Sequence, residues 1–189
     1  MAQTRAPRAD AVRNRKKILD AAREQITAHG PDAGMDEIAA AAGVAVGTLY
    51  RHFPTKNDLV TAVIAEFLAQ VAEAAEAARE RHASGSRAVD EITGFLAYVT
   101  KETATNRAVK AAARTLGADP VGGDAEARAG AALATLIQAG QADGDIHQDV
   151  TVDDLYLLFN NVPTEEPPAS RDRWLTLVLT GLTTHTRTT

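Results

Sequence analysis

Apolar residues recur at helical spacing along most of this chain. In the segment 13–29 they share one face, and Gly30-Pro31 is a strong stop signal; these residues are Ile18, Leu19, Ala22 and Ile26. Apolar stripes bounded by Gly, Pro, Ser or Asp predict further helices over about 56–81, 87–103, 106–116, 124–142, 153–162 and 171–184, the last capped by Ser170. No segment alternates as a strand does, so the pattern predicts an all-α protein of eight or nine helices.

Residues 35–56 predict two short helices joined by a tight turn. The first carries apolar residues at i, i+3, i+4 and i+7: Met35, Ile38, Ala39 and Ala42. Gly43 supplies the left-handed backbone that such a turn needs. The second helix, about 46–53, turns Leu49 and Phe53 inward and stops before Pro54. This is a helix-turn-helix, whose second helix enters the major groove of DNA.

The second helix carries small and polar groups suited to a DNA groove. Thr48 can exchange hydrogen bonds with base edges, the methyl groups of Thr48 and Val46 can touch thymine methyls, and Gly47 lets the backbone approach closely. Arg51 fits a guanine contact and a solvent-facing position equally well. The candidate DNA-binding residues are Arg13, Ala45, Val46, Gly47, Thr48, Tyr50, Arg51, His52 and Lys56.

The net charge of −5 is unevenly distributed. Residues 1–60 hold nine Lys or Arg against seven Asp or Glu, whereas residues 61–189 hold eleven against eighteen. A basic end on an acidic body is typical of a protein with one end facing phosphate. We expect residues 1–10 to form a flexible arm, with Arg5 and Arg8 entering the minor groove, and Arg15, Lys16 and Lys17 to meet phosphates.

Other classes of protein receive little support. The chain has no Cys, no apolar run long enough for a membrane span and no signal-peptide core, so we expect a cytoplasmic protein. It lacks the catalytic motifs of the common hydrolases and nucleotide-binding enzymes, so neither an enzyme nor a cofactor is predicted. Acidic residues around His147 superficially resemble a calcium loop, but its sixth place holds Gln148 and Asp154 fits a helix capping box, so no metal is predicted; they are Asp143, Asp145, Asp149 and Asp154.

The run Leu49-Tyr50-Arg51-His52-Phe53-Pro54-Thr55-Lys56, after Ile38-Ala39 and Gly43-Val44, resembles the TetR family of bacterial transcriptional repressors. The resemblance is specific over roughly residues 12–65. Gly34 and Ala45 stand where family members usually carry Thr or Ser caps. Gly is a tolerable N-cap, whereas Ala costs roughly 1 kcal/mol relative to Ser. Glu37 can still complement the first helix start.

The resemblance implies roles for individual residues. Tyr50, His52 and Lys56 would contact phosphates; the alternatives are core packing for Tyr50 and a helix-cap or surface position for His52. TetR relatives dimerise through their last two long helices, which here implies an interface of Tyr156, Leu157, Trp174, Leu175, Val178 and Leu182, although Trp174 could simply be core. A pocket for a small apolar or amphipathic effector would be lined by Phe67, Phe95, Tyr98, Leu116, Leu136, Ile137 and Phe159, each of which could equally be ordinary core.

The resulting hypothesis is a homodimer that binds double-stranded DNA at a palindromic operator. The domains would be a basic arm (1–10), a three-helix DNA-binding domain (11–58) and a helical bundle for effector binding and dimerisation (59–189). An effector would release the repressor from its operator. The alternative is a nucleoid-associated protein that binds DNA without sequence preference.

Overall fold

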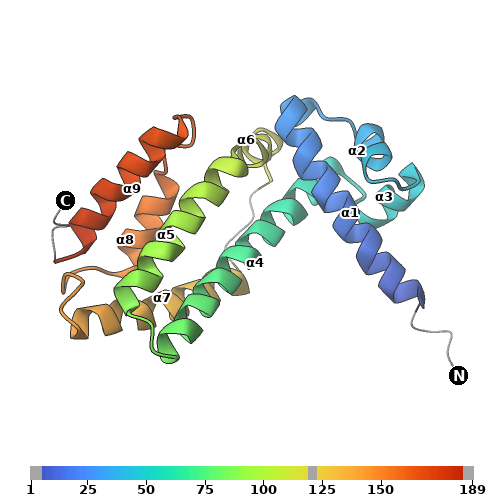
Figure 1. Ribbon diagram of the computed structural model, residues 1–189. Coiled ribbons are helices and arrows are strands. Elements are labelled where there is room, and N and C mark those ends of the chain that lie inside the picture. Colours follow the sequence, from blue (N-terminus) through green and yellow to red (C-terminus); the bar gives the residue numbers. More distant parts are fainter. Residues whose placement is uncertain (1–5, 119–122, 185–189) are drawn as a thin grey trace, which may run out of the picture. The chain divides into compact units, whose positions relative to one another are not determined.

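The computed structural model describes residues 6–118 and 123–184. In these residues the chain forms nine α-helices, one short 3-10 helix and no strand, so the all-α prediction is confirmed (Figure 1). The elements are α1 (Ala6–His29), η1 (Gly30–Asp32), α2 (Met35–Ala41), α3 (Val46–His52), α4 (Lys56–Ala83), α5 (Ala88–Thr105), α6 (Arg107–Leu116), α7 (Asp124–Ala142), α8 (Val152–Asn160) and α9 (Pro168–Leu182). None of these helices is long and apolar enough to cross a membrane.

Two expectations about helix ends were wrong. Helix α1 begins at Ala6, so residues 6–10 are helical rather than part of a flexible arm. A proline is tolerated in a first helical turn, and Asp10 and Arg13 pair one turn apart at 3.3 Å. Helix α9 begins at Pro168, so Ser170 lies inside its first turn and does not cap it. Arg5 and the side chain of Arg8 lie outside the described residues.

The chain divides into two compact units. The N-terminal unit comprises Met1–Phe67 and Asn106–Val121, and the C-terminal unit comprises Leu68–Thr105 and Gly122–Thr189. The division falls within α4, and α6 belongs with α1 to α3 although it follows α5 in the chain. The domain limits drawn from the sequence at residues 10 and 58 stay a prediction.

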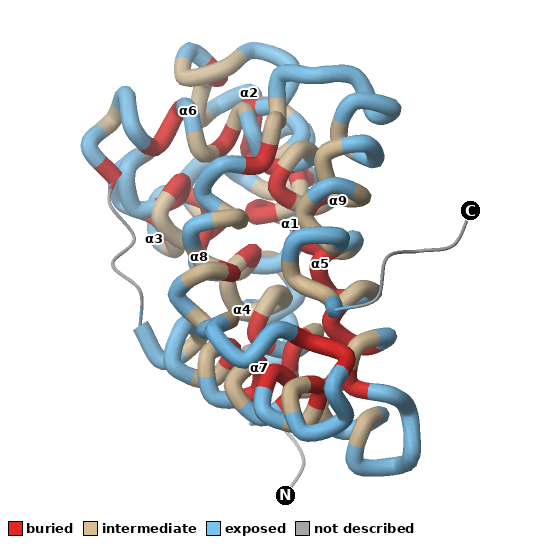
Figure 2. The backbone as a smooth tube through the Cα atoms, turned by 90° about the vertical axis from the view of Figure 1, so that its left-hand side faces the viewer, coloured by how far each residue is buried: buried red, intermediate tan, exposed pale blue. Residues whose placement is uncertain are grey.

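The core of the N-terminal unit is built by α1, α2 and α3 together with α6 and the start of α4 (Figure 2). Five of its fully buried side chains are ones that the helical pattern predicted: Ile18, Leu19, Ile26, Ile38 and Leu49. Arg23 of α1 also pairs with Glu66 of α4 at 3.1 Å, and both side chains are mostly buried. This pairing fixes α4 against α1 within the unit.

The core of the C-terminal unit lies between α5, α7 and α8, with Ala72, Ala75 and Ala78 of α4 fully buried in the same cluster. Small side chains let the helix backbones approach closely. The end of α9 is tied to the α7–α8 loop by a bridge between Ile146 and Thr183. Helix α9 lies on the outside of the unit, because none of its residues is fully buried.

Candidate nucleic-acid interface

The turn between α2 and α3 has the geometry that the sequence predicted. Gly43 has φ of 66°, in the left-handed region, and a Cβ there would meet no other atom within 4 Å. Glycine is therefore favoured at this position by the backbone conformation and not by a lack of room for a side chain. The Val44 amide donates to the Ala39 carbonyl at 3.0 Å, which closes the end of α2.

The two helix starts differ in how they are capped. The Gly34 amide donates to a carboxylate oxygen of Glu37 at 3.0 Å, so Glu37 supplies the side-chain half of a capping box. Ala45 is the N-cap of α3 and offers no side-chain acceptor, as the sequence indicated. An N-cap without a side-chain acceptor leaves the first amides of α3 open to another acceptor, such as a phosphate oxygen.

Helix α3 is anchored on one face and open on the other. Leu49 is fully buried and Phe53, just after the helix, is 4% exposed. Val46 and Tyr50 are 44% and 45% exposed, so the alternative that Tyr50 is a core residue is wrong. Of the other candidates, Ala45, Gly47 and Arg51 are exposed, while Thr48 and His52 are half-buried.

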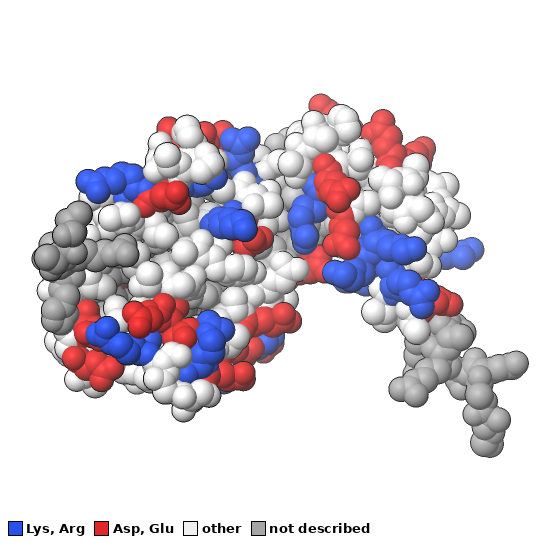
Figure 3. Space-filling view, in the orientation of Figure 1, with Lys and Arg blue, Asp and Glu red and all other residues white. Residues whose placement is uncertain are grey.

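Two cations of the N-terminal unit, Arg15 and Lys56, hold structural positions that the sequence analysis did not predict. The Arg15 guanidinium lies 5.5 Å from the centre of the Phe53 ring, a cation–π contact that fixes α1 against the end of α3. The Lys56 ammonium donates to the Pro31 carbonyl oxygen. Arg13 is exposed and pairs with Asp10, and Figure 3 shows Lys and Arg side chains gathered over α1. The spacing of charges along one helix carried no signal for these contacts between elements.

The residues proposed to line an effector pocket belong to both units. Phe67 and Leu116 lie in the N-terminal unit, where the Lys110 ammonium is 5.2 Å from the centre of the Phe67 ring. In the C-terminal unit the Phe95 and Phe159 rings meet edge-on at 5.7 Å. The remaining candidates there are Leu136 and Ile137, which are buried, and Tyr98, which is half-buried.

Burial, together with the carboxylates of Glu102 and Glu73, raises the pKa of the Tyr98 hydroxyl. At neutral pH this group is therefore a neutral hydrogen-bonding group, suited to a polar atom of a ligand. The pocket assignment as a whole stays a prediction.

Helices α8 and α9 carry an apolar surface that is open to solvent. Leu157 of α8 is 63% exposed and Leu177 of α9, which the sequence reasoning did not single out, is 55% exposed. A groove of about 380 Å³ lies between the two helices, lined by Asp149, Val150, Asp154, Leu157, Leu158, Leu177, Val178, Gly181 and Leu182. Trp174, Val178 and Leu182 are half-buried.

Two other residues of the predicted interface pack inward. The Tyr156 hydroxyl donates to the Glu126 carbonyl of α7 at 3.0 Å, and Leu175 packs against the core of the C-terminal unit.

Two of the acidic residues around His147 form structural contacts within the protein. Both carboxylate oxygens of Asp145 accept from Arg87, and Asp154 forms a capping box with Thr151 at the start of α8. Among the described residues no group of three or more His, Cys, Asp or Glu is arranged to hold a metal ion.

Comparison with known proteins gives matches over both units. The family model described as bacterial regulatory proteins, tetR family, matches residues 18–63, and the C-terminal domain of SbtR-like transcriptional regulators matches residues 87–184. An HTH-type transcriptional regulator of Mycobacterium tuberculosis is 48% identical over 56 residues, which cover 30% of this chain and 24% of that protein. The chain thus matches about a quarter of the length of this curated relative.

Solved structures match over nearly the whole chain. A TetR transcription regulatory protein from Mycobacterium vanbaalenii is 30% identical with a TM-score of 0.73, covering 93% of this chain and 98% of that one. A TetR transcriptional regulator from Streptomyces coelicolor is 30% identical with a TM-score of 0.69, covering 89% and 98%. With a helix-turn-helix in one unit and a matching helical domain in the other, the chain belongs to the TetR family of bacterial transcriptional regulators.

Proposed function

We propose that this regulator is a dimeric repressor that a small apolar or amphipathic effector releases from a palindromic operator. The observation that carries the proposal is the division of α3, which buries Leu49 and leaves Val46, Tyr50 and Arg51 open to solvent. A helix fixed on one side and exposed on the other can enter a major groove without rearranging its own domain.

Six of the candidate DNA-binding residues divide into two chemical groups. Val46, Gly47 and Thr48 at the start of α3 are small and suit direct contact with base edges. Tyr50, His52 and Lys56 carry hydrogen-bond donors that suit phosphates, which fix register without reading sequence. The Lys56 ammonium has three N–H donors, so it can contact a phosphate while keeping its bond to the Pro31 carbonyl.

The apolar surface of α8 and α9 supports the dimer. Large aliphatic side chains such as Leu157 and Leu177 are costly to leave in water, and both line the groove between the two helices, so they form one patch with it. A two-fold partner on this patch would supply the second α3 that a palindrome requires, because its half-sites lie about 34 Å apart, one turn of DNA, and each needs its own recognition helix.

Helix α4 supports the coupling between effector and DNA, because it contributes residues to both units. An effector can shift the dimer away from its DNA-binding state by no more than the difference between its binding free energies for the two states. In a dimer, a shift of α4 would change the placement of the recognition helix of the same protomer.

Selection of bound duplexes from a randomised library, followed by titration at one stated salt concentration, tests the proposal. We expect an enriched palindrome, uniformly weaker binding for Tyr50→Ala, and altered base preference for Thr48→Ala. Lys101→Ala, which removes an exposed cation of α5, is the matched control and should bind as the wild type does.

Binding without any enriched sequence would favour the nucleoid-associated alternative. A protein that ignores duplex DNA at low salt would refute both functions.

A further inference from the structure

The C-terminal unit holds a pocket of about 520 Å³ at the start of α5, beside the α7–α8 loop and the end of α9. It is lined by Arg87, Val89, Asp90, Thr93, Asp145, Leu179 and Thr183. None of these residues belongs to the candidate effector pocket or to the groove between α8 and α9. Its volume falls within the range of about 300–1,000 Å³ typical of small-molecule sites.

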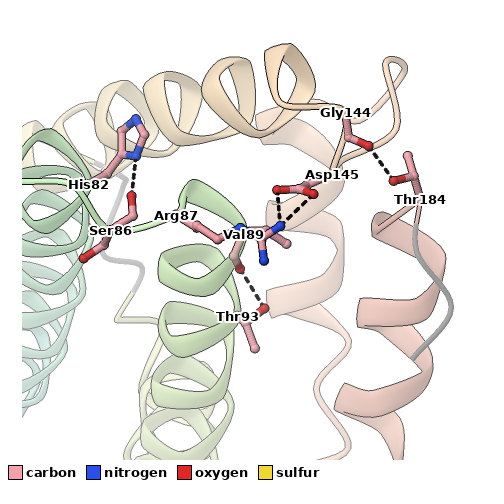
Figure 4. Close-up of polar contacts among 8 residues, drawn as sticks. All are labelled: His82, Ser86, Arg87, Val89, Thr93, Gly144, Asp145 and Thr184. Carbon is pink, nitrogen blue, oxygen red and sulfur yellow. Dashed lines mark hydrogen bonds and ion pairs between the residues drawn. The ribbon is translucent and has the colours of Figure 1, made fainter. Parts of the chain in front are cut away.

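An ion pair between Arg87 and Asp145 lines this pocket, and its guanidinium is accessible to solvent. The Arg87 Nη2 group donates to both carboxylate oxygens of Asp145, at 2.9 and 2.8 Å (Figure 4). The Asp145 side chain is 9% exposed, whereas that of Arg87 is 64% exposed. A guanidinium has five N–H donors. Within the described part of the chain only Nη2 is engaged, so the Nε and Nη1 donors remain for a ligand.

The Asp145 carboxylate is held in place before any ligand arrives. The Thr184 amide donates to the Asp145 carbonyl oxygen at 3.0 Å, and the His147 amide donates to the Leu182 carbonyl at 3.1 Å. The Thr184 hydroxyl also reaches the Gly144 carbonyl (Figure 4). These bonds tie the loop that carries Asp145 to the end of α9, so the carboxylate that pairs with Arg87 is held in position.

Helices α5 and α9 add acceptors and apolar surface to the pocket. Asp90 carries an exposed carboxylate on the first turn of α5. The Thr93 hydroxyl donates to the Val89 carbonyl at 2.8 Å, so its oxygen lone pairs are left to accept. Val89 and Leu179 supply the apolar part. Among the described lining residues there is one cation, Arg87, and there are two carboxylates, Asp90 and Asp145, so this lining carries a net negative charge, which disfavours a simple anion.

We propose that this pocket binds a small zwitterion of the α-amino-acid type with an apolar side chain. The ligand carboxylate meets the unused N–H groups of Arg87, and its ammonium meets Asp90 and Thr93. The aliphatic or aromatic side chain lies against Val89 and Leu179. The site is independent of the proposed operator and its effector, since neither is needed for it to form.

Isothermal titration of the full chain tests the proposal with L-leucine, L-methionine and L-phenylalanine as probes. At least one should bind, and for leucine the analogues that lack one charged group should bind about tenfold more weakly or worse, because each loses a charge-assisted hydrogen bond. These analogues are 4-methylpentanoate, without the ammonium, and 3-methylbutylamine, without the carboxylate; matched analogues serve for the other two amino acids.

Asp90→Asn should weaken binding of the amino acid by a similar factor while leaving the fold intact, because Asp90 is exposed. Asp153→Asn, an exposed first-turn aspartate of α8 outside the pocket, is the matched control and should bind as the wild type does. Two results would overturn the proposal: no binding of any of the three amino acids at millimolar concentration, or equal binding of an amino acid and its two analogues.

Discussion

Gly47 offers a way to separate folding from DNA binding. It lies in α3 and is exposed, and a Cβ built on it meets no atom within 4 Å. Gly47→Ala should therefore stabilise the helix by up to about 1 kcal/mol, since alanine has the higher helix propensity. For a chain of this length such a gain raises Tm by about 2–4 °C.

The same methyl group should impair DNA binding if α3 enters the groove as proposed. Overpacking a close contact costs typically about 1–3 kcal/mol, which corresponds to a loss of about 5- to 150-fold in affinity. Thermal unfolding followed by circular dichroism and titration of the selected duplex by fluorescence anisotropy give the two numbers. We expect opposite signs: higher stability and weaker binding.

Gly94→Ala is the matched control, because Gly94 is an exposed position within α5 whose Cβ would also meet no atom. It should raise Tm by a similar amount and leave the affinity for DNA unchanged. A lower Tm for Gly47→Ala would contradict the open surface around α3. Unchanged DNA affinity in a stabilised Gly47→Ala protein would show that the start of α3 does not approach the bases.

Three further predictions concern the C-terminal unit. Gly140→Ala should lower the free energy of unfolding by about 1–2 kcal/mol in urea titrations, because the new Cβ would lie 2.5 Å from Ile146 Cδ1. This loss exceeds the gain from the higher helix propensity of alanine. Adding Ile146→Val should restore part of the lost stability. The Thr151 hydroxyl and amide lower the pKa of Asp154 below 3.8 in the folded state, so the stability that the ionised carboxylate supplies is present above that pH and is lost as pH falls through the folded pKa. The free energy of unfolding of Asp154→Asn should therefore converge on that of the wild type at low pH. A constant difference between the two proteins down to pH 2 would disprove the assignment. Leu157→Glu should convert a dimer into a monomer in light-scattering measurements, because it places a charge in an apolar interface; a dimer that persists would move the interface elsewhere.

Local signals in the sequence determined where most helices lie and which side chains they bury. The apolar periodicity identified Ile18, Leu19 and Ile26 as core, and all three are fully buried. Gly43 fixed the turn of the helix-turn-helix, since few other residues adopt its backbone conformation at low cost. These features depend on residues within four or five positions of each other, so a linear pattern contains them. The start of α1 was hard to predict for the same reason, because the segment 6–10 has no apolar stripe that would mark it as helical.

Only the tertiary structure decided which elements share a unit and which charges meet. Nothing local indicates that α6 packs with α1, that Arg15 lies over Phe53, or that Arg87 pairs with Asp145 across 58 positions of the chain. The exposure of Leu177 is of the same kind, because α9 has apolar residues on several sides and only packing selects the side that faces the core. Contacts between distant residues are set by how whole helices approach one another, and that approach minimises the free energy of the entire core rather than that of any one segment.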